Sequence, residues 1–451
     1  MCSRRPSFED EINVLTDGNQ SLRSARAVAP LATGRALVTF IAQVGETRQA
    51  ARGILVDPDG APVNTCGEPN EVTYSTFREG GPADQLAAFP VYAAARDAEA
   101  EGFLTWSFVE GDVTAEVPDL DMRVEGRFVG ADGCTIFEEE QPAPWVFDDP
   151  PRGVIVGPPQ AARVGEERFV LAWPRGQSFV GARDGGVFVQ VFREGPFGRP
   201  EFEPVRDPES GEVVDGTAPV RVAGGSASAV SVVPLRDGRF GLLARREVLL
   251  TQAVAFAVLE DTLDVVIPFR ELDRYGIPAS SIAPALAFDG ERFLAVWTRS
   301  DPAAGGVERV VATFLDLEGR PLPTPHSPSG EPFFLTGEAR QQEDPTVTAL
   351  PEGRGFLVAW GDSNQAESED AIRAMVLDPD GEVGFANPAC DRADFQVHGE
   401  LSGLQEAPSA AVLPDGTVLI GWTDRGANGR DLSGSSVRLQ RGDLATYLPL
   451  R

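Results

Sequence analysis

Residues 281–322 read SIAPALAFDGERFLAVWTRSDPAAGGVERVVATFLDLEGRPL, and this stretch decides the fold. It holds three short apolar runs, which end near Phe288, Trp297 and Leu315. The turn FDGER separates the first two runs, a polar loop separates the next two, and the turn LEGRP follows the third. Runs of this length between Asp-Gly turns are typical of β-strands joined in series. The stretch therefore predicts one small antiparallel sheet.

The same unit recurs along nearly the whole chain. The second run of each copy ends at Phe40, Trp106, Trp173, Ala244, Trp297, Trp360 and Trp422. The spacing gives a period of about 64 residues, and that second run is apolar throughout, which indicates burial on both faces. Segments such as EVTYSTF, VVIPFRE, PFFLTGE and FQVHGEL supply a weaker fourth strand.

Four-stranded antiparallel sheets packed between two neighbours form a β-propeller. A row of β-sandwiches is the alternative, but each sandwich needs about 100 residues. We therefore expect an all-β fold, a seven-bladed β-propeller formed by residues 11–451 after a tail of residues 1–10. INVLTDG (residues 12–18) resembles a fourth strand, so we expect it to complete the last blade and close the ring. LATYLPL (residues 444–450) is the alternative for that strand.

Composition excludes several function classes. The chain has 39 basic and 69 acidic residues, a formal charge of −30, which disfavours nucleic acid and anionic membranes as partners. It contains no Lys, which rules out Schiff-base catalysis and a P-loop lysine. No apolar stretch is long enough to span a membrane.

The four cysteines lack C-x-x-C spacing, so a zinc or redox site is not indicated. Cys66 and Cys134 follow equivalent turns, and a disulfide and two free thiols both remain open. Cys2 follows the initiator Met and precedes a polar segment. A lipid-anchored bacterial protein whose signal was replaced by Met would look like this, and so would an ordinary start.

The pattern of entering Pro, Asp-Gly turn, FL-V-W run and LD-x-x-G turn resembles repeat β-propellers of bacterial secreted and surface-lipoprotein type. The resemblance covers nearly the whole chain and implies an extracellular, outer-surface or periplasmic location, with a lipid anchor at Cys2 as an option. The shared residues are structural, so the resemblance implies no functional residue.

Oxygen-rich loops follow the second strands and precede the first strands of the last three copies. Both sets lie on one face of a propeller, so we expect a ligand-binding face there, formed by Asp301, Gln342, Asp344, Asp362, Asn364, Glu369, Asp370, Asp424, Asn428 and Asp431. Asp362, Asn364 and Asp370 are the predicted calcium ligands, because calcium prefers several such oxygens. The competing interpretation is an acidic, solvated surface.

Other residues have simpler interpretations. The repeated Trp residues are expected in the core rather than as sugar platforms. His326 and His398 have no partner at ligand spacing, which predicts surface positions. A sialidase-like Arg clamp would need several Arg beside a Tyr and an acidic pair, and the chain has four Tyr. The fourth copy departs most from the pattern, with Ala244 followed by RREV.

The sequence favours a non-catalytic, monomeric propeller that binds a protein or glycan partner through its acidic loops. It predicts no cofactor other than the calcium that these loops could hold. One alternative is a polysaccharide hydrolase or lyase that uses axial Asp or Glu residues. A second is a structural subunit of a surface assembly.

Overall fold

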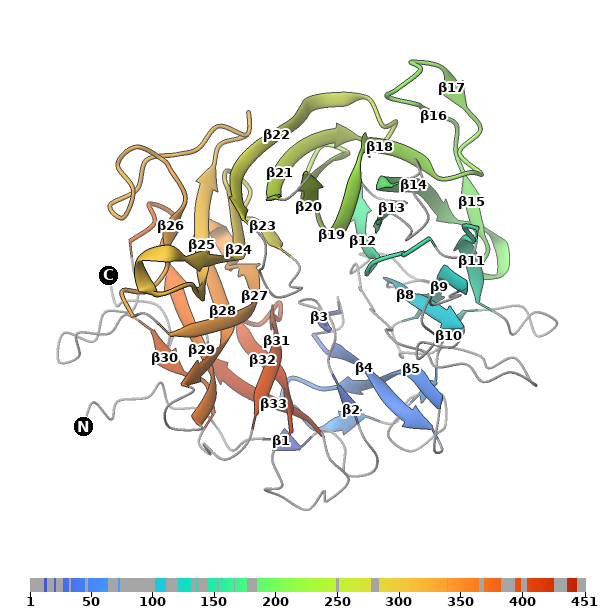
Figure 1. Cartoon of the computed structure of the whole chain (residues 1–451). Coiled ribbons are helices and arrows are strands. Elements are labelled where there is room, and N and C mark those ends of the chain that lie inside the picture. Colours follow the sequence, from blue (N-terminus) through green and yellow to red (C-terminus); the bar gives the residue numbers. More distant parts are fainter. Residues whose placement is uncertain are drawn as a thin grey trace, which may run out of the picture.

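The structure is a computed structural model in which nearly all regular elements are strands (Figure 1). It describes residues 12–13, 20–21, 27–31, 34–44, 48–63, 72–73, 102–110, 121–130, 135–136, 144–151, 154–165, 167–176, 185–248, 251–276, 284–338, 340–364, 369–382, 394–398, 404–425 and 436–443. The four cysteines, and with them the disulfide and lipid-anchor predictions, lie outside these residues. The segment 444–450 lies outside them as well.

The strands form seven larger sheets, which we number after the repeat copies. Sheet 1 contains β2 (Gln20–Ser21), β3 (Val28–Pro30), β4 (Ala36–Val44), β5 (Arg48–Val56), β6 (Pro62–Val63) and β7 (Val72–Thr73). Sheet 2 contains β8 (Gly102–Glu110), β9 (Asp121–Val129), β10 (Thr135–Ile136) and β11 (Trp145–Asp148). Sheet 3 contains β12 (Gln160–Val164), β13 (Arg168–Arg175), β14 (Gly186–Glu194), β15 (Pro200–Phe202) and β18 (Val220–Gly224).

The other four sheets follow in the same order. Sheet 4 contains β19 (Ser226–Pro234), β20 (Arg239–Val248), β21 (Thr251–Glu260) and β22 (Val265–Gly276). Sheet 5 contains β23 (Ala285–Phe288), β24 (Phe293–Asp301), β25 (Val307–Leu315) and β26 (Phe333–Phe334). Sheet 6 contains β27 (Gln341–Ala349), β28 (Phe356–Asn364), β29 (Glu369–Leu377) and β30 (Phe395–Gln396). Sheet 7 contains β31 (Gln405–Val412), β32 (Thr417–Asp424), β33 (Ser436–Asp443) and β1 (Ile12–Asn13).

Smaller elements lie between these strands. A separate ribbon, β16 (Val205–Arg206) and β17 (Val213–Val214), is inserted in the outer part of sheet 3. The described residues also include three one-turn 3-10 helices, η1 (Pro196–Gly198), η2 (Pro302–Ala304) and η3 (Pro351–Gly353).

The architecture is an all-β propeller with antiparallel blades, and its sheets are set around a common centre (Figure 1). Six sheets are complete blades, with an inner strand, two long middle strands and an outer strand. In sheet 2, β8 pairs with β9, and no inner strand is present among the residues the structure describes. The expected count of seven blades is therefore not reached: the structure gives six complete ones, because residues 74–101 before β8 are not described.

The N-terminal segment pairs with the last sheet. Ile12 of β1 lies opposite Leu439 of β33 in an antiparallel ladder, so the start of the chain supplies the outer strand of sheet 7. Apolar residues of sheets 1 and 7 form one buried cluster, which includes Val38, Phe40 and Leu419. A hydrogen bond from the Val28 amide to Ser409 Oγ, at 2.9 Å, joins the same two sheets.

The turns repeat as closely as the strands. Asp57, Asp316 and Asp378 each accept hydrogen bonds on Oδ1 from two backbone amides of their own turn. The Gly three residues later has a positive φ of 77°, 68° and 81°, a conformation that residues with a Cβ rarely adopt. The D-x-x-G signature therefore fixes these turns through an Asp side chain and a left-handed Gly.

Candidate functional site

The predicted acidic residues at the ends of the second strands are buried in ion pairs. Asp301 bonds to the guanidinium of Arg309, and its Oδ1 accepts a hydrogen bond from the Ala303 amide. Asp424 pairs with Arg438 at 2.6 Å and accepts a 3.2 Å hydrogen bond from Gln405. Burial raises the pKa of Asp301, but the bonds from Arg309 and Ala303 outweigh it and leave the pKa lowered. These carboxylates therefore have protein partners.

The predicted calcium ligands lie on one hairpin, β28–β29. Asp362 is opposite Ala371 and Ser363 is opposite Asp370, so Asp362 and Asp370 point to opposite faces of the hairpin. Asp362 is buried and lies 3.5 Å from Arg340. No group of three or more His, Cys, Asp or Glu with metal-binding geometry occurs in the described part of the chain. The side chains of Asn364 and Glu369, and all of Asn428 and Asp431, lie outside it, so calcium binding stays a prediction.

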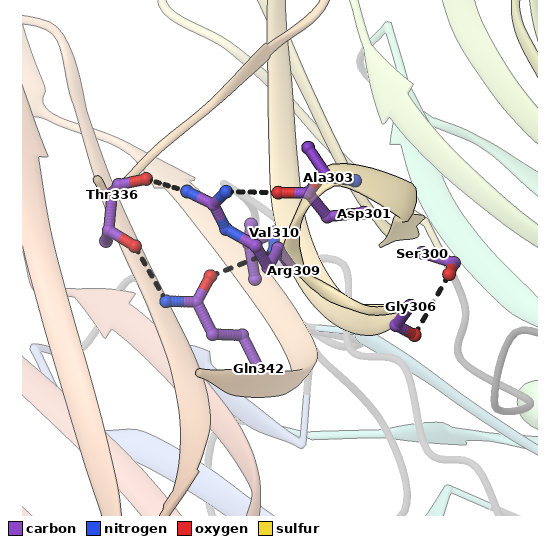
Figure 2. A network of polar contacts seen from close by, with 8 residues as sticks. All are labelled: Ser300, Asp301, Ala303, Gly306, Arg309, Val310, Thr336 and Gln342. Atoms are coloured by element: carbon purple, nitrogen blue, oxygen red, sulfur yellow. Dashed lines mark hydrogen bonds and ion pairs between the residues drawn. The ribbon is translucent and has the colours of Figure 1, made fainter. Parts of the chain in front are cut away.

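Gln342 and Asp344 lie on β27 and connect neighbouring sheets. Figure 2 shows that Gln342 accepts a hydrogen bond from the Val310 amide and donates one to Thr336 Oγ1, at 3.0 and 2.9 Å. Arg309 completes this network by bonding to Asp301 and to the Thr336 carbonyl. Asp344 Oδ2 accepts a 3.3 Å hydrogen bond from the Ala407 amide of sheet 7. Both predicted ligand residues thus take part in contacts between sheets.

A bulge in the outer strands of sheets 2 and 4 creates a repeated contact that the sequence did not reveal. The ladders skip Phe147 and Leu272, and the next residues, Asp148 and Asp273, face the following sheet. Asp148 accepts a 2.6 Å hydrogen bond from Trp173 Nε1, and Asp273 accepts one of 3.1 Å from Trp297 Nε1. Arg175 and Arg299, two residues after each Trp, bind the same carboxylates. The prediction of buried Trp residues is confirmed for Trp173, Trp297, Trp360 and Trp422.

The two His residues differ. His326 is exposed and stacks on Phe333, as expected. The surface prediction for His398 is wrong: its side chain is buried, its ring lies 5.5 Å from Trp422, and Nε2 accepts a hydrogen bond from the Ile372 amide. The sequence could not show that the second residue after the outer strand β30 turns toward the next Trp.

The irregular fourth copy contains the most unusual polar group of the described residues. The ladder of sheet 4 places Glu247, Gln252 and Tyr275 in one row across three strands, and Arg245 and Asp273 two residues further along the same face. Tyr275 belongs to the apolar cluster shared with Trp297 of sheet 5, so this face is turned toward sheet 5. Arg299 of sheet 5 binds Asp273 at 3.1 Å. We call this set, with Arg299, the Tyr275 cluster. Glu308 of sheet 5 lies on the other face of its strand, where Gln341 Nε2 of sheet 6 donates a 3.2 Å hydrogen bond to it.

Burial and charge set the electrostatics of the cluster. Burial raises the pKa of Tyr275 to about 12, with Asp273 and Glu308 adding to the rise and Arg245 and Arg299 opposing it. Burial lowers the pKa of Arg245, against the effect of Tyr275, Glu247 and Glu308. Arg245 Nε donates a 2.8 Å hydrogen bond to Ser228 Oγ. Tyr275 is therefore a neutral phenol at physiological pH.

The amide of Gln252 is the least satisfied group in the cluster. Gln252 is 7% exposed and Tyr275, directly opposite on β22, is 9% exposed. Gln252 Oε1 has no hydrogen-bond partner among the described residues. A buried polar atom without a partner costs about 1–3 kcal/mol, so a donor from a bound water or ligand would be favourable at this position.

The cluster was missed because its residues are far apart in the sequence. Several Arg, a Tyr and carboxylates do lie together, as an Arg-clamp site would need, but between two sheets. The signal in the sequence was the RREV segment in the only copy that lacks the aromatic residue.

No protein-family model matches the chain, and no curated protein matches it. Solved structures with a similar fold include a polysaccharide lyase described as an ulvan lyase, at 10% identity and a TM-score of 0.49, covering 98% of this chain and 100% of that one. The β-propeller domain of the Trilobed protease from Pyrococcus furiosus is 10% identical, with a TM-score of 0.41 and coverage of 96% and 97%. An α-L-arabinofuranosidase from Fusarium graminearum is 11% identical, with a TM-score of 0.38 and coverage of 80% and 99%. At these values the likeness concerns the fold alone.

Proposed function

We propose that the protein is a β-propeller that recognises a polysaccharide, with the Tyr275 cluster as the sugar-binding site. The observation that carries the proposal is the unpartnered, buried Oε1 of Gln252 opposite the buried phenol of Tyr275. A sugar hydroxyl both donates and accepts hydrogen bonds, so it can pair with an amide and a phenol together. Binding sites in proteins commonly combine apolar surroundings with a few such polar groups.

The test is a binding screen of neutral and acidic polysaccharides, with a matched pair of variants. Arg299→Gln and Arg175→Gln each remove the Arg of a Trp–Asp–Arg contact, but only Arg299 belongs to the Tyr275 cluster. We expect both to lower the melting temperature similarly, and only Arg299→Gln to weaken glycan binding. No binding to any glycan, or equal effects of both variants on binding, would overturn the proposal.

Cleavage of the polysaccharide by hydrolysis or elimination is the second candidate. Glu247 is the exposed carboxylate of the cluster, so it could accept a proton from an attacking water. The leaving oxygen would then need a proton donor, and a phenol with a pKa of about 12 is a weak one. Recognition therefore ranks first. The same screen, read for reducing ends and for unsaturated products, detects turnover.

We also propose a closed ring of seven blades formed by residues 11–451, in which the segment before β8 contributes the missing inner strand and β1 closes the seam. The pairing of β1 with β33 and the apolar cluster shared by sheets 1 and 7 support this. Residues 1–10 remain a proposed tail.

Location and partners remain proposals from the sequence. No helix among the described residues is long and apolar enough to cross a bilayer. Secretion or surface attachment, a lipid at Cys2 and a monomeric state suit a glycan-binding propeller. Calcium binding is checked by comparing melting temperatures in calcium and in chelator.

A further inference from the structure

We infer that the Tyr275 cluster selects neutral sugars with free hydroxyl groups rather than uronate or sulfated glycans. This inference rests on the proposed sugar site and names its ligand class.

The charges of the cluster leave no positive charge free to bind an anion. Its cations are Arg245 and Arg299, and its carboxylates are Glu247 and Asp273. Arg299 Nη1 already lies 3.1 and 3.2 Å from the two oxygens of Asp273. Asp301 and Arg309 nearby form a neutral pair. A carboxylate or sulfate entering here would meet one carboxylate for each guanidinium group, and Glu308 on the far face of β25 adds negative charge to the surroundings.

The whole molecule adds to this preference. Its formal charge of −30 repels polyanions before they reach the site. The chain has 39 basic residues against 69 acidic ones, so the Arg residues do not offset the repulsion.

The group that lacks a partner is neutral. Gln252 Oε1 is a hydrogen-bond acceptor, so the ligand must present a donor to it. The phenol of Tyr275 stays protonated well beyond neutral pH and can donate to a ligand oxygen. A free sugar hydroxyl meets both requirements, whereas an O-methylated position cannot donate. Gln252 is thus the residue that we assign to specificity.

The test compares glycan probes on the full-length protein. The probes are oligosaccharides of xylan, mannan and arabinan, their fully O-methylated forms, and oligomers of galacturonate and alginate. We expect a neutral oligosaccharide to bind with an affinity that changes little with salt, and its O-methylated form to bind at least about 10-fold more weakly. Gln252→Met, which keeps the side-chain length and removes the amide, should weaken binding of the free oligosaccharide about 10-fold and reduce the difference between the two forms.

The outcomes separate the two proposals. Binding of galacturonate or alginate that is lost in Tyr275→Phe would overturn the neutral-sugar inference and leave the sugar site in place. Binding that neither Tyr275→Phe nor Gln252→Met changes would overturn both. A melting temperature that is unchanged in Tyr275→Phe, and unchanged or raised in Gln252→Met, shows that the effect is on binding rather than folding.

Discussion

Residues of opposite charge occupy the same repeat position in different sheets. The residue two places after the Trp is Arg in sheets 3 and 5, as Arg175 and Arg299, and Asp in sheets 6 and 7, as Asp362 and Asp424. The Arg residues bind an Asp of the preceding sheet. Burial raises the pKa of Asp362 despite the attraction of Arg373 and Arg340. The ionised form of Asp362 is therefore disfavoured in the folded protein.

Asp362→Asn should change how stability depends on pH. Because the folded-state pKa of Asp362 is raised, its contribution is fully present below the unfolded-state pKa and is lost as the pH rises through the folded value. We expect the Asn variant, relative to wild type, to gain melting temperature between acid and neutral pH. Thermal melts from pH 4 to pH 7 check this. A variant whose stability relative to wild type falls toward pH 7 would show that the Arg residues dominate instead.

At the scale of elements, the residue that follows the bulge of an outer strand changes together with the residue at the Trp position of the next sheet. Asp148 and Asp273 follow the bulge, and in each case the next sheet has a Trp whose indole N–H donates a hydrogen bond to that Asp. Between sheets 3 and 4, the ladder skips Val222, Ala223 takes the position of the Asp, and Ala244 takes that of the Trp. Between sheets 5 and 6 the Trp remains, but the ladder of β26 ends at Phe334, before the position that the Asp takes in sheets 2 and 4. Trp360 Nε1 has no partner within the described part of the chain.

Replacing Trp by Phe should therefore have unequal effects in these two sheets. Trp297→Phe removes a hydrogen bond to a carboxylate and leaves Asp273 with less stabilisation, whereas Trp360→Phe removes no such bond. Both variants lose similar apolar contact. We expect Trp297→Phe to be more destabilising by about 1.5–3 kcal/mol in denaturant unfolding. Equal losses would mean that the indole bond contributes nothing.

The sequence predicts the elements well where the pattern is local. The apolar second strands, the D-x-x-G turns and the weaker fourth strands follow from periodicity and turn chemistry, as in β24 and β25. The site did not follow, because a one-residue bulge decides whether Asp273 or Leu272 faces the next sheet, and a bulge leaves no periodic signal. The burial of Asp362 and Asp424 was missed because their Arg partners come from other strands or loops.

At the scale of the whole molecule, the two ends of the chain meet in sheet 7. The ladder between β1 and β33 is short, but it covers the outer edge of the last sheet. Blades of a propeller are held mainly by packing against their neighbours, so an uncovered edge would loosen sheet 7 first.

Removing residues 1–18 should lower the melting temperature, because β1 is lost and sheet 7 keeps only three strands. Removing residues 1–10 leaves β1 intact and serves as the control, with no change expected. Each lost backbone hydrogen bond contributes about 0.5–1.5 kcal/mol, so a total loss on the order of 1–3 kcal/mol is expected. Equal melting temperatures for both truncations would contradict closure by the N-terminal strand.

The dissociation constant of the best-binding neutral oligosaccharide, measured for wild-type protein and for Tyr275→Phe, tests the central claim most directly. The variant removes one hydroxyl from the cluster and keeps the aromatic ring, which belongs to the same apolar cluster as Trp297 of sheet 5. The account predicts binding weakened by about 10-fold at an unchanged melting temperature. Identical dissociation constants for the two proteins would contradict it.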